Sequence, residues 1–442
     1  MATDTRLAAD LDTASLHGSL EDPALSSMNL LNEIADRYPQ AVPFAAGRPA
    51  EEFFDTDDIH RALRAFADHL ADERGMSPAQ VRRTLFQYGR TKGVVHHLVA
   101  RNLAVDEGIE VDPEAVVVTV GCQEAIYLVL RALRRGPEDV VLAVAPTYVG
   151  LTGAARLVDL PVLPVASGDD GVDLDDLLAV LRRARREGLR PRALYVMPDF
   201  ANPTGLSMDR AVRQRLLDLA HREDLLLLED NPYGLFRSGR DRVPTLKALD
   251  RHRRVVYLGS FAKTVLPGAR VGYVVADQRV ADRSGEPGLL ADQLAKIKSM
   301  LTVNTSPIAQ AVVGGRLVQQ ECSLAAATVQ EQQRYARNLR QLLDGLARRF
   351  PAGGPPAAAV RWNAPVGGFF VVLTLPFAVD DQLLEYSARS HGVLWTPMRH
   401  FYDGPGGEHQ LRLSISSVTP VQIDLGLDRL AALVADRLGA GP

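Results

Sequence analysis

Apolar runs alternate with amphipathic stretches along the middle of this sequence. Seven of these runs are rich in β-branched residues or leucine: Ala115–Val120, Asp139–Val144, Val162–Val165, Ala193–Met197, Leu225–Leu228, Val255–Gly259 and Val271–Ala276. Several of the stretches between them have helical periodicity, as in "LDDLLAVLRRARREG". Continuous apolar runs that alternate with helices are typical of a mostly parallel sheet covered by helices on both faces.

The two ends of the chain follow other patterns. Residues 1–30 are polar and weakly patterned, and we expect them to form an arm. Residues 58–105 are mainly helical in pattern, with an interruption at "FQYGRTKG" (Phe86–Gly93). After residue 300 a helical tract, Ser323–Phe350, leads to the segment "PAGGPPAAA" and then to short strands in "GGFFVVLTL", "GVLWTP" and "LRLSIS". A final amphipathic helix is expected at the carboxyl end.

These patterns predict an α/β protein of two units. Residues 61–314 would form the large unit around the mixed, mostly parallel sheet, and residues 315–442 a smaller α+β unit. Residues 1–60 would supply the arm and the start of the smaller unit. A chain of 442 residues is long enough to bury a core in each.

Composition excludes several classes of protein. The net charge of −4 gives no reason to expect a nucleic acid or an anionic membrane as partner. No apolar run approaches the ~18 residues of a membrane span, and the acidic N-terminus lacks the apolar core of a signal peptide. The two cysteines, Cys122 and Cys322, form neither a disulfide framework nor a metal-ligand spacing. We therefore expect no metal and a cytoplasmic setting.

Candidate chemistry lies where the apolar runs end. In open α/β sheets, ligands bind beyond the carboxyl ends of the strands. Gly121, Cys122 and Gln123 follow the first run and begin a helix, where free N–H groups and the helix dipole suit a phosphate. Other polar or aromatic residues follow the later runs: Tyr148, Asn202, Asp230, Tyr233, Ser260 and Lys263.

Each of these residues has an ordinary explanation when it is taken singly. Asn202 could be a turn residue, Asp230 an N-cap, Lys263 a solvated charge and Arg270 the partner of a surface acid. The joint pattern is harder to explain in this way. An anion cradle, an aromatic ring, an amide, a carboxylate and a lysine would lie along one rim of the sheet, in that chain order.

Six motifs in order resemble the fold-type I, class I and II aminotransferases, which use pyridoxal 5′-phosphate (PLP). They are "GCQEA", "APTYVG", "NPTG", "EDNPYG", "SFAKTVLPGARVGY" and "LRLSIS". The resemblance extends from "PFAAGRP" (Pro43–Pro49) to Arg412 and so covers nearly the whole chain. It implies an aspartate aminotransferase-like large domain and transaminase activity.

The resemblance assigns the catalytic roles to Lys263 and Asp230. Lys263 would hold the cofactor covalently through its amine and move a proton at the substrate α-carbon. Asp230 would pair with the pyridine nitrogen and keep the ring protonated. Asn202 and Tyr233 would hydrogen-bond the phenolic oxygen of the cofactor, and Tyr148 would stack on its ring.

The same resemblance assigns residues to the phosphate and to the substrate. The backbone of Gly121, Cys122 and Gln123 would hold the phosphate, together with the Ser260 hydroxyl and the Arg270 guanidinium. Tyr88 in "FQYGRTKG" matches a tyrosine that reaches the phosphate of the other subunit, which implies a homodimer, although it could equally be an ordinary loop tyrosine. The substrate would contact Gly47, Asn202 and Arg412, the last through its α-carboxylate.

Two longer segments, "SLHGSLEDPALSSMNLLNEIADRYPQAVPFAAGRP" and "TPMRHFYDGPGGEHQLRLSIS", resemble transaminases that make arylglycines. Examples of such products are 3,5-dihydroxyphenylglycine, 4-hydroxyphenylglycine and phenylglycine. This resemblance implies an arylglyoxylate as amino acceptor. Four aromatic residues are candidates for the pocket around its ring: Phe53, Phe54, Phe401 and Tyr402.

Three alternatives remain open. One is a general aromatic or 2-aminoadipate aminotransferase of primary metabolism. Another is an enzyme of the same fold that catalyses a different reaction, such as β-elimination or oxidation. The third is a regulator that carries a non-catalytic PLP-binding domain, but regulators of this kind need a DNA-binding module ahead of it, and here the arm is short and not basic.

Overall fold

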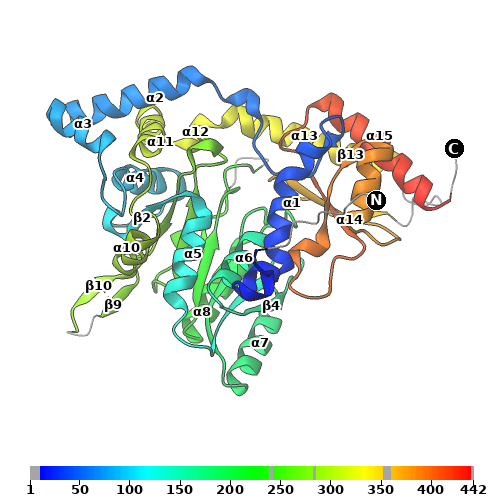
Figure 1. The fold of residues 1–442 in the computed structure, drawn as a ribbon, viewed down its shortest axis with the longest axis horizontal. Helices are drawn as coiled ribbons and strands as arrows, with labels where there is room; N and C mark the ends of the chain where they lie inside the picture. Colours follow the sequence, from blue (N-terminus) through cyan, green and yellow to red (C-terminus); the bar gives the residue numbers. More distant parts are fainter. Residues whose placement is uncertain (1–9, 238–241, 282–284, 352–359, 440–442) are drawn as a thin grey trace.

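The computed structural model describes residues 10–237, 242–281, 285–351 and 360–439. They form two adjoining units, with the smaller one built mainly from the C-terminal part of the chain (Figure 1). No helix among these described residues is long and apolar enough to span a bilayer.

A seven-stranded sheet forms the centre of the large unit. Its strand order is β2-β8-β7-β6-β5-β3-β4, and only β8 runs antiparallel to its neighbours. The strands are β2 (Val116–Thr119), β3 (Asp139–Ala145), β4 (Val162–Ala166), β5 (Arg190–Val196), β6 (Leu226–Asp230), β7 (Val255–Ser260) and β8 (Gly272–Val275). All seven predicted runs are strands of this sheet, which confirms the predicted fold class.

Helices cover both faces of this sheet. One face packs on α5 (Gly121–Leu133), α6 (Val149–Leu157) and α10 (Leu290–Leu301). The other face packs on α7 (Leu174–Arg186), α8 (Arg210–Arg222), α4 (His96–Glu107) and α11 (Pro307–Gln319). Alternate residues of one strand pack against the helices on opposite faces. In β5, Tyr195 packs in the core beneath α5, α6 and α10, and Leu194 in the core beneath α7 and α8. Six of the seven apolar runs are continuous because their strands are largely buried on both faces, whereas the edge strand β4 exposes Pro164 and Ala166.

The small unit holds a four-stranded antiparallel sheet of order β11-β12-β15-β14. Its strands are β11 (Arg361–Trp362), β12 (Phe370–Thr374), β14 (Thr396–Pro397) and β15 (Gln410–Ser414). Helices α13 (Val329–Arg349) and α15 (Pro420–Arg437) pack on it, and β1 (Val42–Pro43) pairs with β13 (Val393–Leu394) beside it. The N-terminal segment thereby joins the C-terminal unit.

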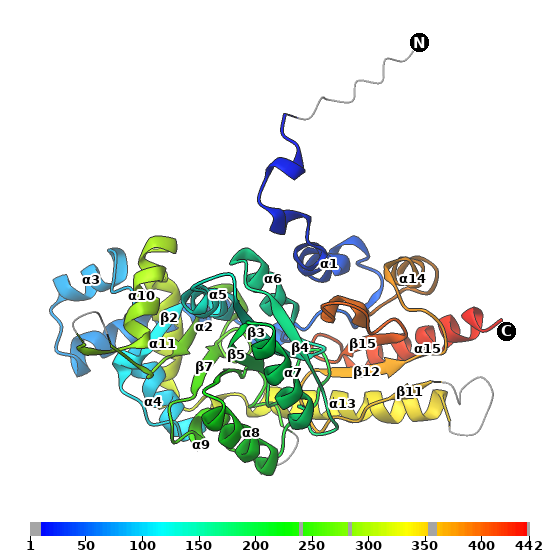
Figure 2. The same ribbon diagram turned by 90° about the horizontal axis from the view of Figure 1, so that it is seen from below.

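The structure differs from the sequence prediction at two helices. The tract predicted over Ser323–Phe350 is divided at Thr328 into α12 (Leu324–Ala327) and α13. The arm contains a helix, α1 (Pro23–Arg37), which packs beside α6, and the described residues before it, 10–22, extend away from the body (Figure 2). Residues 352–359 of the Pro/Gly/Ala segment lie outside the described residues, and the three domain limits stay a prediction.

Candidate active site at the strand ends

A cavity of about 220 Å³ lies where the strands of the large sheet end and the small unit meets them. Cys122 at the start of α5, Asn202 after β5, Asp230 at the end of β6 and Lys263 after β7 line it, and the small unit contributes Arg412. The other predicted site residues that line it are Gly47, Gln123, Tyr148, Tyr233, Ser260 and Arg270. Gly121 lies beside Arg270 at its edge.

Lys263 follows β7 by three residues and has a buried amine. Its Nζ donates a hydrogen bond of 2.8 Å to the carbonyl oxygen of Gly47, in the N-terminal segment. Burial lowers the pKa of the amine to about 8, and the positive charges of Arg270, Arg412 and Arg48 act in the same direction. A substantial fraction of this amine is therefore neutral near pH 8, the form that reacts with a carbonyl group.

Asp230 ends β6 with its carboxylate inside the cavity wall. Burial raises the pKa of this carboxyl to about 6, against two hydrogen bonds that lower it. The Tyr195 hydroxyl donates to Oδ2 at 2.6 Å, and the Cys122 thiol lies 3.6 Å from Oδ1. The carboxylate is thereby fixed in position between two donors.

Sequence reasoning missed Tyr195, because it lies within an apolar run and was interpreted as core. Strand alternation carries the signal that could have found it. Tyr195 pairs with Leu228 across β5 and β6, so Asp230, two residues beyond Leu228, faces the same side of the sheet. The contact of the Cys122 thiol with Asp230 was not predicted either, because the sequence analysis assigns only the backbone of Cys122, to the phosphate.

An anion cradle lies between the start of α5 and Arg270. The N-cap residue Val120 offers no side-chain cap, so the first N–H groups of α5 are available to a ligand. Arg270 adopts φ 51°, and a Cβ added at Gly121 would lie 2.4 Å from its Nη2. A Cβ at Gly272 would lie 2.5 Å from the Cys122 nitrogen. Helix N–H groups next to a guanidinium fit a phosphate dianion.

Arg412 contacts two aromatic rings, with its guanidinium carbon 4.2 Å from the centroid of Phe370 and 4.9 Å from that of Phe401. Its Nη1 donates to Asn202 Oδ1 at 2.6 Å and its Nη2 to the Ala45 carbonyl at 2.8 Å. Burial lowers its pKa to about 10, and its buried Nε has no partner among the described residues. An unpaired buried donor favours an added acceptor such as a carboxylate.

The remaining predicted residues divide into two groups. A Cβ at Gly47 would lie 2.8 Å from Phe370 Cζ, so the segment before α2 (Thr56–Asp68) passes closely over the cavity. Phe401 lines the cavity, whereas Phe53 and Phe54 line a separate space of about 50 Å³ that Lys263 also borders. Tyr402 and Tyr88 do not line this cavity, and Tyr88 is 86% exposed.

Comparison with known proteins finds relatives across nearly the whole chain. A sequence profile of the family described as "Aminotransferase class I and II" matches residues 45–430. The chain is 59% identical over 432 residues to the (S)-3,5-dihydroxyphenylglycine transaminase of Amycolatopsis orientalis, covering 98% of this chain and 96% of that protein.

Two solved structures share the fold at lower identity. One is a Pyrococcus horikoshii kynurenine aminotransferase in complex with PMP, at TM-score 0.78 and 28% identity, covering 95% of this chain and 99% of that one. The other is an α-aminoadipate aminotransferase from Thermus thermophilus complexed with N-(5′-phosphopyridoxyl)-L-leucine. It has TM-score 0.78 and 29% identity, and the two chains are covered to 98% and 100%.

Proposed function

The chain belongs to the class I and II aminotransferases, which are PLP-dependent, and on this premise we propose that its acceptor is an arylglyoxylate. The product would be an arylglycine of the 3,5-dihydroxyphenylglycine type, with an amino acid as donor. The single observation that carries the proposal is the 59% identity to the Amycolatopsis orientalis enzyme over 98% of this chain.

The cavity supports an aromatic substrate. Arg412 would bind the α-carboxylate, and the rings of Phe370 and Phe401 next to its guanidinium would contact an aryl group attached to the same α-carbon. An arylglycine carries its ring directly on Cα, so the carboxylate and the ring must be bound close together. This geometry suits a short, flat side chain.

We propose that this chain's residues hold the cofactor at both of its ends. Lys263 would hold PLP through its amine, and Asp230 would pair with the ring nitrogen of PLP. The cradle formed by Gly121, Cys122 and Arg270 would hold the phosphate, together with the hydroxyl of Ser260. When it is bound, PLP supplies an electron sink that stabilises negative charge at the substrate α-carbon.

Proton transfer at Cα is assigned to Lys263. An amine with a pKa near 8 can accept and return a proton near neutral pH, whereas an unperturbed lysine remains charged. Arg412 orients Cα toward this amine. Tyr148 would lie on the face of the cofactor ring, and Asn202 and Tyr233 would contact its phenolic oxygen.

A homodimer is proposed as the active assembly. Tyr88, which would reach the active site of a second subunit, is 86% exposed. Two other apolar side chains are also exposed, Phe86 at 70% and Met300 at 86%. Residues 10–22, before α1, extend beyond the body of the chain, as an arm that packs on a second copy would (Figure 2). Apolar exposure of this kind is typical of a protein–protein contact.

The substrate proposal is tested by incubating the holoenzyme with 3,5-dihydroxyphenylglyoxylate and a panel of amino acid donors. We expect arylglycine formation with an equal amount of keto acid from the donor. If no donor yields arylglycine while another amino acid and keto acid exchange, the acceptor is wrong and the transaminase activity stands.

A second candidate is a 2-aminoadipate aminotransferase. The observation in its favour is the match to the Thermus thermophilus α-aminoadipate aminotransferase along 98% of this chain. Rates with 2-oxoglutarate and aminoadipate, compared with rates on arylglyoxylates, separate the two candidates. A higher kcat/KM for aminoadipate would favour the second.

A further inference from the structure

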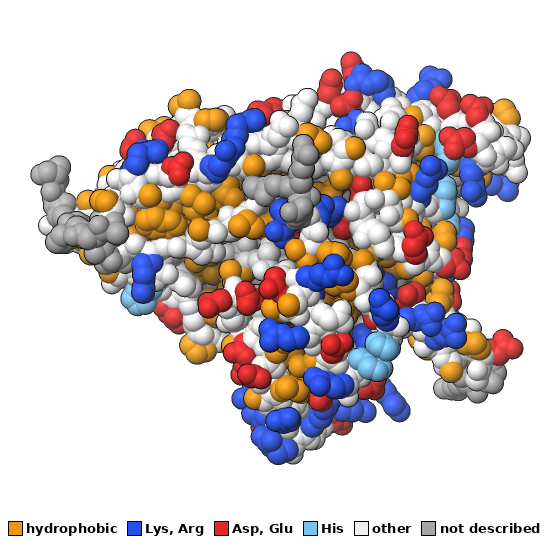
Figure 3. Space-filling view, turned by 180° about the vertical axis from the view of Figure 1, so that it is seen from behind, with side chains coloured by type: hydrophobic (Ala, Val, Ile, Leu, Met, Phe, Trp, Pro, Cys, Tyr) orange, Lys and Arg blue, Asp and Glu red, His pale blue; other side chains and the backbone are white. Residues whose placement is uncertain are grey.

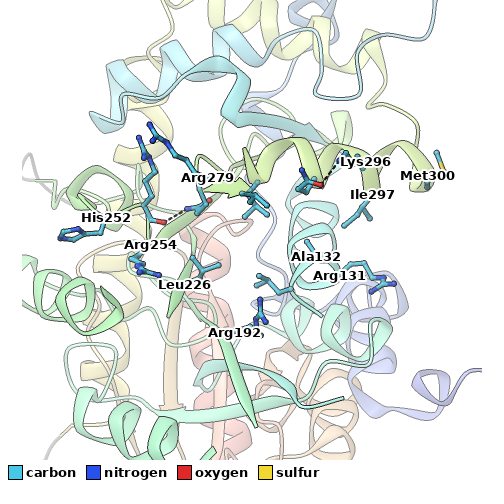
Figure 4. A pocket seen from close by; sticks show the side chains of 16 residues that line it. Arg131, Ala132, Arg192, Leu226, His252, Arg254, Arg279, Lys296, Ile297 and Met300 are labelled. Atoms are coloured by element: carbon cyan, nitrogen blue, oxygen red, sulfur yellow. Dashed lines mark hydrogen bonds between the residues drawn. The ribbon is translucent and has the colours of Figure 1, made fainter. Parts of the chain in front are cut away.

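A second cavity, of about 1130 Å³, lies at the other end of the large sheet, where its parallel strands begin (Figure 4). Its walls come from the starts of β5 and β6, the segment before β7, the end of α5, helix α10 and β9 (Arg279–Ala281). Strand β9 forms a hairpin with β10 (Pro287–Leu289). Leu226 in this wall begins β6, and Asp230 ends it. Because strands rise ~3.3 Å per residue, the cavity lies ~13 Å from the candidate active site along β6.

Six cationic side chains line this cavity, and no Asp or Glu of the described residues does: Arg131, Arg192, Arg253, Arg254, Arg279 and Lys296. Arg192 contacts Asp139, and Arg254 contacts Asp224. The other four form no ion pair within the described part of the chain. Figure 3 shows Lys and Arg side chains gathered beside the β9–β10 hairpin. A net positive concavity on a chain of charge −4 attracts anions locally.

Apolar and unpartnered polar groups define the ligand further. Between the cations lie apolar side chains, from strand, hairpin and helices: Ala132, Leu133, Leu226, Val280, Leu290 and Ile297. Two buried atoms of wall residues, Nε of Arg254 and Oε1 of Gln278, have no hydrogen-bond partner among the described residues. Nε requires an acceptor and Oε1 a donor, and leaving both unpaired is costly.

From these three features we propose that the cavity binds an organic phosphate with an apolar or aromatic body, of nucleotide size. The phosphates would contact the arginines, which hold such groups through paired hydrogen bonds. The body would lie on the apolar wall formed by α5, α10 and the start of β6. A hydroxyl or amino group of the ligand would satisfy Gln278. The volume is sufficient for a molecule of this size.

Calorimetric titration of the holoenzyme tests this with three probes that separate the parts of the ligand. ATP combines charged phosphates with an aromatic nucleoside. Pyrophosphate carries only the charged phosphates, and adenosine is only the nucleoside. We expect one ATP per chain, bound about tenfold more tightly than pyrophosphate and weakened by salt, with adenosine the weakest. Absence of ATP binding at millimolar concentration, or pyrophosphate binding as tight as that of ATP, overturns the proposal.

Charge reversal locates the binding. The double variant Arg253→Glu and Arg279→Glu should lose affinity for ATP by about tenfold or more while keeping wild-type transaminase activity. The matched control is Arg182→Glu with Arg186→Glu, two exposed arginines of α7 outside this cavity, and its affinity should stay unchanged. Equal losses in both variants would mean unspecific attraction. If the first variant altered only the oligomeric mass, the cavity would belong to an interface between copies of this chain.

Discussion

At the scale of single residues, the account depends on how burial changes two ionisable groups. The Lys263 amine and the Asp230 carboxyl are both removed from water, and burial moves their pKa values toward each other, to about 8 and about 6. Each is then stabilised by particular neighbours. Tyr195 is the neighbour that the sequence motifs did not indicate, and it makes the shortest contact to Asp230.

Substitution Tyr195→Phe tests that contact. The hydroxyl donates to the charged form of Asp230 and so lowers its pKa. Without the hydroxyl we expect kcat/KM to fall about tenfold, roughly the ~1.4 kcal/mol of a hydrogen bond to a charged group. The acid limb of the pH–rate profile should move to higher pH.

Tyr257→Phe is the matched control for this prediction. Tyr257 is also a buried strand tyrosine, 2% exposed like Tyr195, but it contacts Asn231 and not Asp230. Its pH profile should stay where it is. Identical profiles for the two variants would remove the positioning role of Tyr195.

The lowered pKa of Lys263 predicts how this amine reacts in the cofactor-free protein. Only the neutral amine attacks formaldehyde, so reductive methylation of Lys263 should rise with pH around a midpoint of about 8 rather than the usual 10.5. Mass spectrometry of the Lys263 peptide at a series of pH values gives that midpoint. The exposed Lys296 provides the comparison within the same sample. A midpoint for Lys263 above 10 would contradict the assigned environment.

At the scale of elements, the site is built where strands end and α5 begins. A fully buried ion pair fixes this region: Lys298 Nζ in α10 lies 2.8 Å from Glu124 Oε2 in α5. Glu124 also accepts from the Thr302 hydroxyl at 2.7 Å and from the Val120 N–H at 2.6 Å. The carboxylate thereby holds Val120, the residue before α5, and ties this helix to α10.

Removing one partner should destabilise the fold strongly. Lys298→Met leaves Glu124 buried without its counter-ion, which should cost about 3–5 kcal/mol in the free energy of unfolding. The double variant Glu124→Gln with Lys298→Met removes both charges and should recover most of this loss. Urea unfolding of the holoenzyme measures both values. A double variant no more stable than the single one would contradict the pairing argument.

The elements also show how far sequence patterns reach. Six of the seven strands were predictable because they are largely buried on both faces and so remain apolar along their length. The edge strand β4 was predictable because its residues are apolar, although Pro164 and Ala166 are exposed. The interruption at Thr328 was not, because the helical periodicity continues across one residue at φ −106° and ψ 22°. Helix α1 was missed because it is fixed by distant contacts, such as Ser27 with His400, which a local polar pattern does not contain.

At the scale of the whole molecule, the site needs both units and both ends of the chain. Lys263 of the large unit donates to Gly47 of the N-terminal segment, and Arg412 of the small unit donates to Asn202. The motifs predicted which residues converge, since most of them follow a predicted strand of the large sheet. The hydrogen bonds between these residues, and the contacts of Arg412 with Phe370 and Phe401, depend on how the two units pack. The sequence motifs did not predict them.

Tyr88 is predicted to contact the active site of the other subunit, because it does not line the cavity of its own chain. Mixed dimers of Lys263→Ala and Tyr88→Ala chains would contain one site with both residues intact. Random mixing should therefore return about one quarter of the wild-type sites, since half the dimers are mixed and each has one intact site. The readout is transaminase activity after joint unfolding and refolding, with each variant refolded alone as control. No gain over the separate variants would place Tyr88 outside the neighbouring site.

The central claim is that the amine of Lys263 binds the cofactor, and borohydride reduction tests it most directly. The protein is loaded with PLP, reduced, digested and analysed by mass spectrometry. We predict one pyridoxyl phosphate adduct per chain, on Lys263, with no adduct in Lys263→Ala. An adduct on another lysine, or none in protein that still transaminates, would contradict the account.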